Sequence, residues 1–183
     1  MANNWKKLSS ETVYENAWIE VQHHEVINPS GGPGIYGQVN FKNLAIGVVP
    51  LDADGNTYLV GQHRFPIDEY TWEIPEGGCP ENEDMLDCAK RELMEETGLR
   101  ADKWTLISRI HTSNSVCNET GFIFLAEELT MGTAEPEETE DLTLKKLPLE
   151  EAFRMVMANE ITDSLSVAGI LKTRILKAGS KEN

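Results

Sequence analysis

The segment from residue 77 to 99 constrains this chain most, because a loop that opens on a glycine pair is expected there and runs into an unusually acidic helix. At about 100° per residue, Leu86, Ala89 and Leu93 form one apolar stripe. Glu96 falls inside that stripe. A carboxylate buried alone is costly unless it is paired or ligates a metal ion. The pattern therefore predicts a helix that faces the core and holds a cation there.

Two further glutamates strengthen this prediction. Glu92 lies at the edge of the stripe, four residues before Glu96, where like charges repel. Glu95 adds a third carboxylate, whereas Arg91 points away and is expected to balance only one charge. A solvated acidic face is the alternative, which the position of Glu96 disfavours. All-oxygen ligation favours Mg²⁺ or Mn²⁺ over Zn²⁺.

The composition is that of one globular domain with a substantial core: 183 residues, 40% hydrophobic and 26% charged. A net charge of −15 argues against nucleic-acid and anionic-membrane partners. The longest strongly apolar stretch, 44–51, is too short to span a membrane. Cys79, Cys88 and Cys117 match no zinc-finger spacing, and the N-terminus lacks an apolar signal segment, so a reduced cytoplasmic protein is expected. Cys88 is expected to pack rather than react.

Apolar runs and turn residues predict an α/β fold with a mixed sheet between helices. An N-terminal hairpin element, 1–42, precedes the main domain, 43–183, and its exposed edges are expected to find a partner. Besides the acidic helix, two C-terminal helices are expected, the second capped by Asp163. The expected elements are strands at 18–27, 35–42, 44–51, 57–62, 71–74, 104–110, 121–126 and 142–147, an acidic loop at 127–141, and helices at 149–158 and 163–177.

The acidic segment matches a known motif at every defined position. It reads Gly77-x5-Glu83-x7-Arg91-Glu92-Leu93-x-Glu95-Glu96-x-Gly98-Leu99, and on this motif the chain resembles the Nudix hydrolases. The resemblance implies an α/β/α sandwich that hydrolyses a nucleoside diphosphate linked to another moiety. It also implies the roles of the acids. The metal ligands would be Glu92, Glu95, Glu96 and the carbonyl of Glu76, with Arg91 and Glu83 orienting the acids.

The flanks of the motif resemble the ADP-ribose pyrophosphatase branch of that family. The matching stretches are the N-terminal strands, Gly61-Gln-His-Arg64, Trp72-Glu-Ile-Pro-Glu-Gly77 and Leu149-Glu-Glu-Ala. In that branch the N-terminal strands pack across a homodimer, and the partner subunit helps to hold the nucleoside. Arg64 matches an arginine that contacts the substrate diphosphate. An ordinary surface cation at a strand end is the alternative for Arg64.

One stretch departs from the branch. Residues 111–120 contain no proline, where ADP-ribose hydrolases often carry a Ser-Pro-Gly type loop. This departure leaves room for other nucleoside diphosphate sugars, such as GDP-mannose. The candidate substrate contacts are Gly78, Glu119, Trp18, Tyr36 and Gln38. For the last three, an ordinary strand position is the alternative.

The general base is expected outside the motif. In this branch the base lies on a loop after the central strands in a Glu-x-Glu context, which Glu138-Thr-Glu140 fits. Glu138 is then the base and Glu140 a further metal ligand. Glu119 is the rival base, and a solvated charge run is the alternative for the whole loop.

The leading expectation is Mg²⁺-dependent hydrolysis of ADP-ribose or a similar nucleotide sugar to a nucleoside monophosphate and a sugar phosphate. Two other functions stay open. A nucleoside triphosphate pyrophosphatase of the same family would usually be shorter and lack the N-terminal strands. A non-catalytic nucleotide-sugar sensor would commonly have lost carboxylates of the motif, all of which are present here.

Overall fold

The computed structural model describes residues 4–132 and 142–179. Ten strands and three helices lie within these ranges. None of these helices is long and apolar enough to cross a membrane. The elements are β1 (Lys6–Glu15), β2 (Ile19–Ile27), β3 (Pro33–Phe41), β4 (Asn43–Pro50), β5 (Asn56–Arg64), β6 (Glu69–Glu73), β7 (Glu76–Pro80), α1 (Met85–Thr97), β8 (Leu99–His111), β9 (Thr120–Met131), β10 (Thr143–Pro148), α2 (Leu149–Met157) and α3 (Ser164–Gly179).

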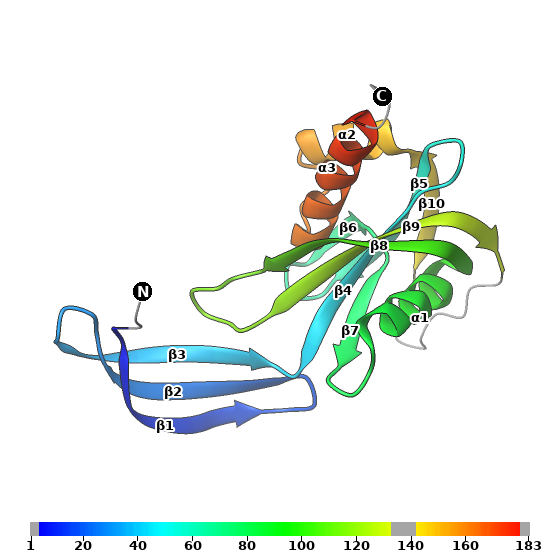
Figure 1. The fold of residues 1–183 in the computed structure, drawn as a ribbon. Helices are drawn as coiled ribbons and strands as arrows, with labels where there is room; N and C mark the ends of the chain where they lie inside the picture. Colours follow the sequence, from blue (N-terminus) through cyan, green and yellow to red (C-terminus); the bar gives the residue numbers. More distant parts are fainter. Residues whose placement is uncertain (1–3, 133–141, 180–183) are drawn as a thin grey trace.

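A four-stranded sheet in the order β7-β4-β9-β8 forms the centre of the molecule. It is mixed, because β4 pairs in parallel with β9 while the other two pairings are antiparallel. Strand β4 is a nearly continuous apolar run, which suits a strand covered on both faces. A second, antiparallel sheet has the order β10-β5-β6. Figure 1 shows α1 and α3 on opposite sides of the central sheet.

Alternate side chains of β4 enter two separate cores. Ile46 and Val48 pack toward α1 with Leu93, whereas Val49 packs toward α3 with Ile170. All five are fully buried, and each contributes about 1.5–3 kcal/mol relative to an exposed side chain. The α/β/α arrangement predicted from the sequence is therefore confirmed.

The N-terminal element is a three-stranded antiparallel sheet in the order β1-β2-β3. The predicted strand pair corresponds to β2 and β3, and β1 is an additional strand. Every residue of β1 is exposed, so its sequence carries no alternation of buried and exposed positions. In Figure 1 this sheet projects from the body, and the β8–β9 connection reaches back to β3. There the Val39 N–H donates to the Val116 carbonyl at 2.9 Å.

Two parts of the predicted layout are wrong. The glycine stretch expected as a loop is strand β7, which pairs with β4 from Gly77 opposite Ile46 onward. The acidic stretch expected as a loop from 127 is still strand β9 as far as Met131, which pairs with Leu99 at the start of β8. Charge does not break that strand, because Lys103 and Lys177 both form ion pairs with Glu127.

Candidate active site

Both ends of α1 are capped, which sets the positions of its acids. The Asp84 carboxylate accepts hydrogen bonds from the backbone N–H groups of Leu86 and Asp87 at 2.9 and 3.3 Å. Gly98 ends the helix in the left-handed conformation, at φ 71°, and its N–H donates to the Met94 carbonyl. The two caps fix the ends of the helix and thereby the direction in which its acids point.

Of the three motif glutamates on α1, two are buried against β7. Glu92 is 8% exposed and Glu96 is 4% exposed. A Cβ atom on Gly77 would lie 2.2 Å from the Glu92 carboxyl carbon, so this close approach requires glycine. The Glu96 carboxylate accepts a hydrogen bond from the Glu76 N–H at 3.0 Å. The glycine strand and the acidic helix thus form one unit.

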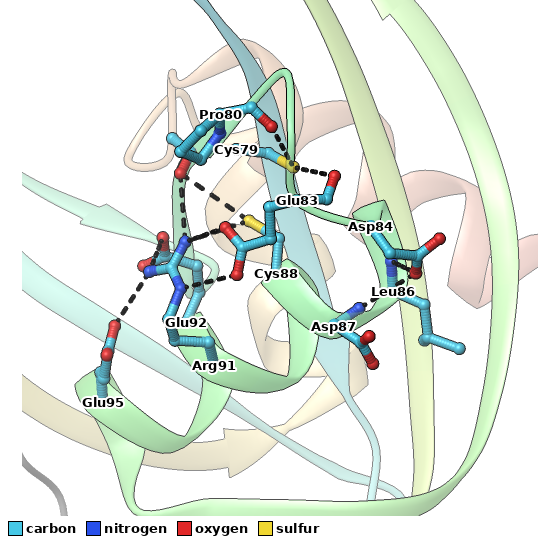
Figure 2. A network of polar contacts seen from close by, with 11 residues as sticks. Cys79, Pro80, Glu83, Asp84, Leu86, Asp87, Cys88, Arg91, Glu92 and Glu95 are labelled. Carbon is cyan, nitrogen blue, oxygen red and sulfur yellow. Dashed lines mark hydrogen bonds and ion pairs between the residues drawn. The ribbon is translucent and has the colours of Figure 1, made fainter.

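Arg91 connects most of the acids (Figure 2). Its Nη1 donates to Glu92 at 2.7 Å and to Glu95 at 3.1 Å, which corrects the expectation that it serves only one acid. Its Nε and Nη2 donate to the two carboxylate oxygens of Glu83 at 3.0 and 2.9 Å. These bonds lower the pKa of Glu83 and raise that of Arg91. Arg91 reaches Glu95 because residues four positions apart lie on the same face of a helix.

The donor set of this unit suits a hard divalent cation. One guanidinium contacts three carboxylates, and Glu96 adds a fourth beside them. The net negative charge of these side chains is partly removed from water, which is costly unless a cation is bound. All of these donors are oxygens, which Mg²⁺ and Mn²⁺ prefer. The residues therefore fit the metal that the motif implies.

A cavity of about 390 Å³ borders this unit. Its walls come from β4, β7, the start of α3 and the N-terminal element. Of the predicted site residues it contains Trp18, Arg64, Glu76, Gly78 and Glu119. Tyr36 and Gln38 line a second cavity, of about 370 Å³, together with Trp5 and His24. Glu138 and Glu140 lie outside the described residues.

Arg64 is held between two carboxylates, of which one, that of Glu76, lines the cavity. Its Nε donates to both oxygens of the buried Glu73 at 3.0 Å, and its Nη2 donates to Glu76 at 3.1 Å and also contacts Glu73. Burial alone would lower the pKa of Arg64, but the hydrogen bond and charge of Glu73 outweigh it and raise this pKa. Arg64 is thus held in place by ion pairs, and its contact with a diphosphate stays a prediction.

Glu119 lies on the connection between β8 and β9 and lines the same cavity. Its carboxylate accepts a hydrogen bond from the Thr112 hydroxyl at 2.5 Å. The neighbouring Asn118 side chain accepts a hydrogen bond from the Phe41 N–H at 2.7 Å. The position of Glu119 therefore depends on the N-terminal element.

The structure adds acidic side chains that the sequence did not assign to the site. The carboxyl group of Glu76, and not only its carbonyl, faces Arg64, and Asp163 lies beside it. Burial, followed by the charges of Asp163 and Glu73, raises the pKa of Glu76 well above its usual range. Asp163 also caps α3, as predicted, because it accepts a hydrogen bond from the Ser166 N–H at 2.7 Å. Nothing in the local sequence links positions so far apart.

Comparison with known proteins gives matches over most of the chain. The NUDIX domain family model matches residues 41–165, and the model for a nucleoside diphosphate sugar hydrolase N-terminal domain matches residues 5–39. An ADP-ribose pyrophosphatase of Mycobacterium tuberculosis is 31% identical, over 97% of this chain and 86% of its own. An ADP-ribose pyrophosphatase of Bacillus subtilis is 29% identical over 94% of each chain.

A solved structure has the same fold. It is described as an ADP compounds hydrolase, and it superposes with a TM-score of 0.88 over 100% of this chain and 99% of that one. The sequence identity is 20%, so this likeness speaks for the fold alone.

Proposed function

From the premise that this chain belongs to the NUDIX domain family and is a Nudix hydrolase of the ADP-ribose pyrophosphatase type, we propose that it cleaves the pyrophosphate bond of a nucleoside diphosphate sugar. ADP-ribose and GDP-mannose represent the substrate class, and the products are a nucleoside monophosphate and a sugar phosphate. One observation carries this proposal: the cavity at β7, the strand against which the acidic helix packs, is also lined by Arg64 and by residues of the N-terminal element.

Nudix hydrolases use divalent metal ions. We propose Glu92, Glu95, Glu96 and the Glu76 carbonyl as ligands, with Glu140 as a further one, and Mg²⁺ as the ion, with Mn²⁺ as a substitute. When bound, such an ion neutralises diphosphate charge and lowers the pKa of a bound water. Arg91 acts through the acids, because its hydrogen bonds orient Glu92 and Glu95.

Arg64 is proposed to bind the diphosphate. Its hydrogen bonds within the described residues run from Nε and Nη2, so Nη1 is left for a phosphate oxygen. Glu73 fixes the plane of the guanidinium, which makes the contact directional. The Gly78 backbone lies on the same wall and approaches the substrate without a side chain in the way.

The proton of the attacking water needs a carboxylate acceptor. We propose Glu138 for this role, with Glu119 as the alternative because its carboxylate already lies at the cavity. The two assignments predict different variants to be inactive, which separates them.

The nucleoside is proposed to lie toward the N-terminal element, residues 1–42, and the chemistry within the catalytic domain, residues 43–183. Trp18 is 70% exposed at the first cavity, while Tyr36 and Gln38 line the second one across the 112–119 connection. Exposed apolar side chains on β1 support a homodimer formed through these strands. A cytoplasmic location stays a prediction that rests on the free cysteines.

A substrate panel tests the proposed function. The protein is incubated with Mg²⁺ and ADP-ribose, GDP-mannose, UDP-glucose, dinucleoside polyphosphates or nucleoside triphosphates, and the products are identified by mass. We expect a nucleoside monophosphate and a sugar phosphate from at least one nucleotide sugar. Turnover of triphosphates alone would instead indicate a nucleotide-sanitising enzyme. Binding of a nucleotide sugar without turnover of any compound would indicate a sensor.

A further inference from the structure

Two buried thiols come from β7 and α1, the same two elements that form the acidic unit. Cys79 on β7 and Cys88 on α1 are both fully buried, as the packing prediction for Cys88 requires. The carboxylate of Glu83, from the connection between these elements, lies beside the Cys88 sulfur (Figure 2). The two sulfur atoms and one Glu83 oxygen lie within 4.8 Å of one another. Three side chains that can ligate a metal ion therefore converge at one place.

The thiols contact backbone oxygens only at long range, while Cys88 also interacts with the Glu83 carboxylate, the Cys79 thiol and Arg91. The Cys79 Sγ lies 3.7 Å from the Pro80 carbonyl and 3.6 Å from the Glu83 carbonyl, and the Cys88 Sγ lies 3.8 Å from the Gly78 carbonyl. These are long contacts of a weak donor. Burial raises the pKa of both thiols, so both carry their protons when nothing is bound. Backbone oxygens thus surround the pair and offer further donors.

We propose that Cys79, Cys88 and Glu83 form a binding site for a thiophilic divalent cation, such as Zn²⁺ or Cd²⁺. This site is separate from the oxygen ligands proposed for Mg²⁺. Sulfur ligands select such ions over Mg²⁺. In a tetrahedral site with metal–sulfur bonds of about 2.3 Å, the ligand atoms lie roughly 3.7 Å apart. The side chains therefore need to close by only about 1 Å. A water or a backbone carbonyl completes the coordination.

The charges around the site are compatible with this ion. Binding releases one proton from each thiol, and two thiolates with one carboxylate then outweigh the divalent cation by a single negative charge. Arg91 is placed to compensate that charge, because its Nη2 lies 3.4 Å from the Cys88 sulfur. The guanidinium therefore has the position of an outer hydrogen-bond donor to a metal-bound thiolate.

The site is coupled to the catalytic acids through Glu83. Both oxygens of Glu83 hold Arg91, and Arg91 holds Glu92 and Glu95. A cation that is coordinated by Glu83 withdraws this carboxylate from Arg91 and so disturbs the positions of Glu92 and Glu95. Occupation is thus expected to lower the Mg²⁺-supported rate, a consequence that rests on the proposed function. Binding itself does not depend on that function.

The test is a Cd²⁺ titration of the full-length reduced protein in excess Mg²⁺. It is followed by the ultraviolet cadmium–thiolate charge-transfer absorption and by native mass spectrometry. We expect one equivalent to bind with a thiolate band. The carboxylate ligands of the motif give no such band. The result is therefore independent of the proposed function, and a protein inactive toward nucleotide sugars would still show the band. Absence of the band in the wild-type protein would overturn the site.

Matched cysteine variants give the specificity of the test. Cys79→Ser and Cys88→Ser are each expected to abolish the band, and Cys117→Ser, which alters the third free thiol, to keep it. Cys79→Ser is also expected to keep the basal Mg²⁺-supported rate while losing inhibition by Zn²⁺. A band that survives in both Cys79→Ser and Cys88→Ser, or that Cys117→Ser removes, overturns the assignment.

Glu83→Gln keeps the test decisive if Cys88→Ser fails to fold. It leaves both thiols in place, and we expect the Cd²⁺ affinity to fall at least about tenfold. An unchanged affinity in a variant with a native circular dichroism spectrum would remove Glu83 from the site and overturn the proposal as stated.

Discussion

The acidic unit, formed by β7 and α1, is organised within one chain, whereas the N-terminal sheet leaves apolar side chains exposed. In the unit formed by β7 and α1, Glu92 and Glu96 are buried and Arg91 joins the neighbouring acids through direct hydrogen bonds. In the N-terminal sheet, all ten residues of β1 are exposed, among them Leu8 and Tyr14. The unit is organised without any second molecule, whereas the sheet presents apolar surface.

This difference separates chemistry from recognition. The acids proposed to bind metal are positioned by contacts between a strand and a helix that adjoin in sequence. The surfaces proposed to bind the nucleoside involve the N-terminal sheet, the connection at 112–119 and, by our proposal, a second subunit. Changes in the acidic unit should therefore remove turnover without changing assembly. Changes in the sheet should alter assembly and substrate affinity first.

The largest effect is expected for Glu96→Gln. Loss of one charged ligand should lower kcat roughly 10³-fold, because the bound metal contributes several kcal/mol of charge stabilisation. The fold should survive, because the amide removes a buried charge and keeps the shape. The rate with a nucleotide sugar and the melting temperature are measured together. Glu81→Gln, an exposed acid nearby, is the control, and equal rates for both variants would contradict the metal-site assignment.

The base assignment is the next test. Glu138→Gln should lower kcat about 10²–10³-fold with little change in KM, because a positioned base contributes about that much. Glu119→Gln should change KM more than kcat. If Glu119→Gln instead loses kcat while Glu138→Gln stays active, the assignment must be reversed, and the base would belong to the connection that contacts the N-terminal sheet.

Arg91→Ala should have a smaller effect. The variant keeps every metal ligand but loses the hydrogen bonds to Glu83, Glu92 and Glu95. We expect a 10- to 100-fold loss in apparent metal affinity or rate, typical of outer-shell partners. Activity is measured against Mg²⁺ concentration. Lys90→Ala, which breaks an exposed pair with Asp87, should leave that curve unchanged; a shift of equal size would argue against a specific role of Arg91.

Gly77→Ala tests how tightly β7 and α1 fit. The added Cβ meets the Glu92 carboxyl group, so the strand or the acid must move, at a cost of about 1–3 kcal/mol in the free energy of unfolding. Gly37→Ala is the matched control, because a Cβ there meets nothing within 4 Å. Urea unfolding of both variants gives the comparison. Equal stabilities would mean that the close approach is not important.

The smallest effect on turnover is expected for Leu8→Asp on β1. The side chain is 63% exposed in the single chain, so the charge should leave its fold intact but prevent the proposed association. Ile175→Asp on α3, at a side chain 66% exposed, is the matched control. Sedimentation should give a monomer for the first variant and a dimer for the second. A dimer in both cases would argue against assembly through the N-terminal strands.

The sequence predicted best what neighbouring residues determine. The buried position of Glu96 follows from helical periodicity, and the caps at Asp84 and Gly98 keep that periodicity undisturbed. The sequence predicts a loop where β7 lies, because paired glycines are typical of turns. They are present so that Glu92 can approach the strand.

Two other features could not be predicted for a different reason. Strand β1 buries nothing in one chain, so no apolar pattern marks it. The contacts among Arg64, Glu73, Glu76 and the distant Asp163 arise only when β5, β6, β7 and α3 pack together. Local spacing carries no information about such contacts.

The central claim is that the acidic unit holds the divalent cation needed for hydrolysis. Binding of Mn²⁺, followed by its paramagnetic resonance in the wild-type protein, Glu81→Gln and Glu96→Gln, tests it without any substrate. We predict that the wild type and Glu81→Gln bind the ion alike and that Glu96→Gln has lost most of the affinity. Unchanged binding by a folded Glu96→Gln would contradict the claim.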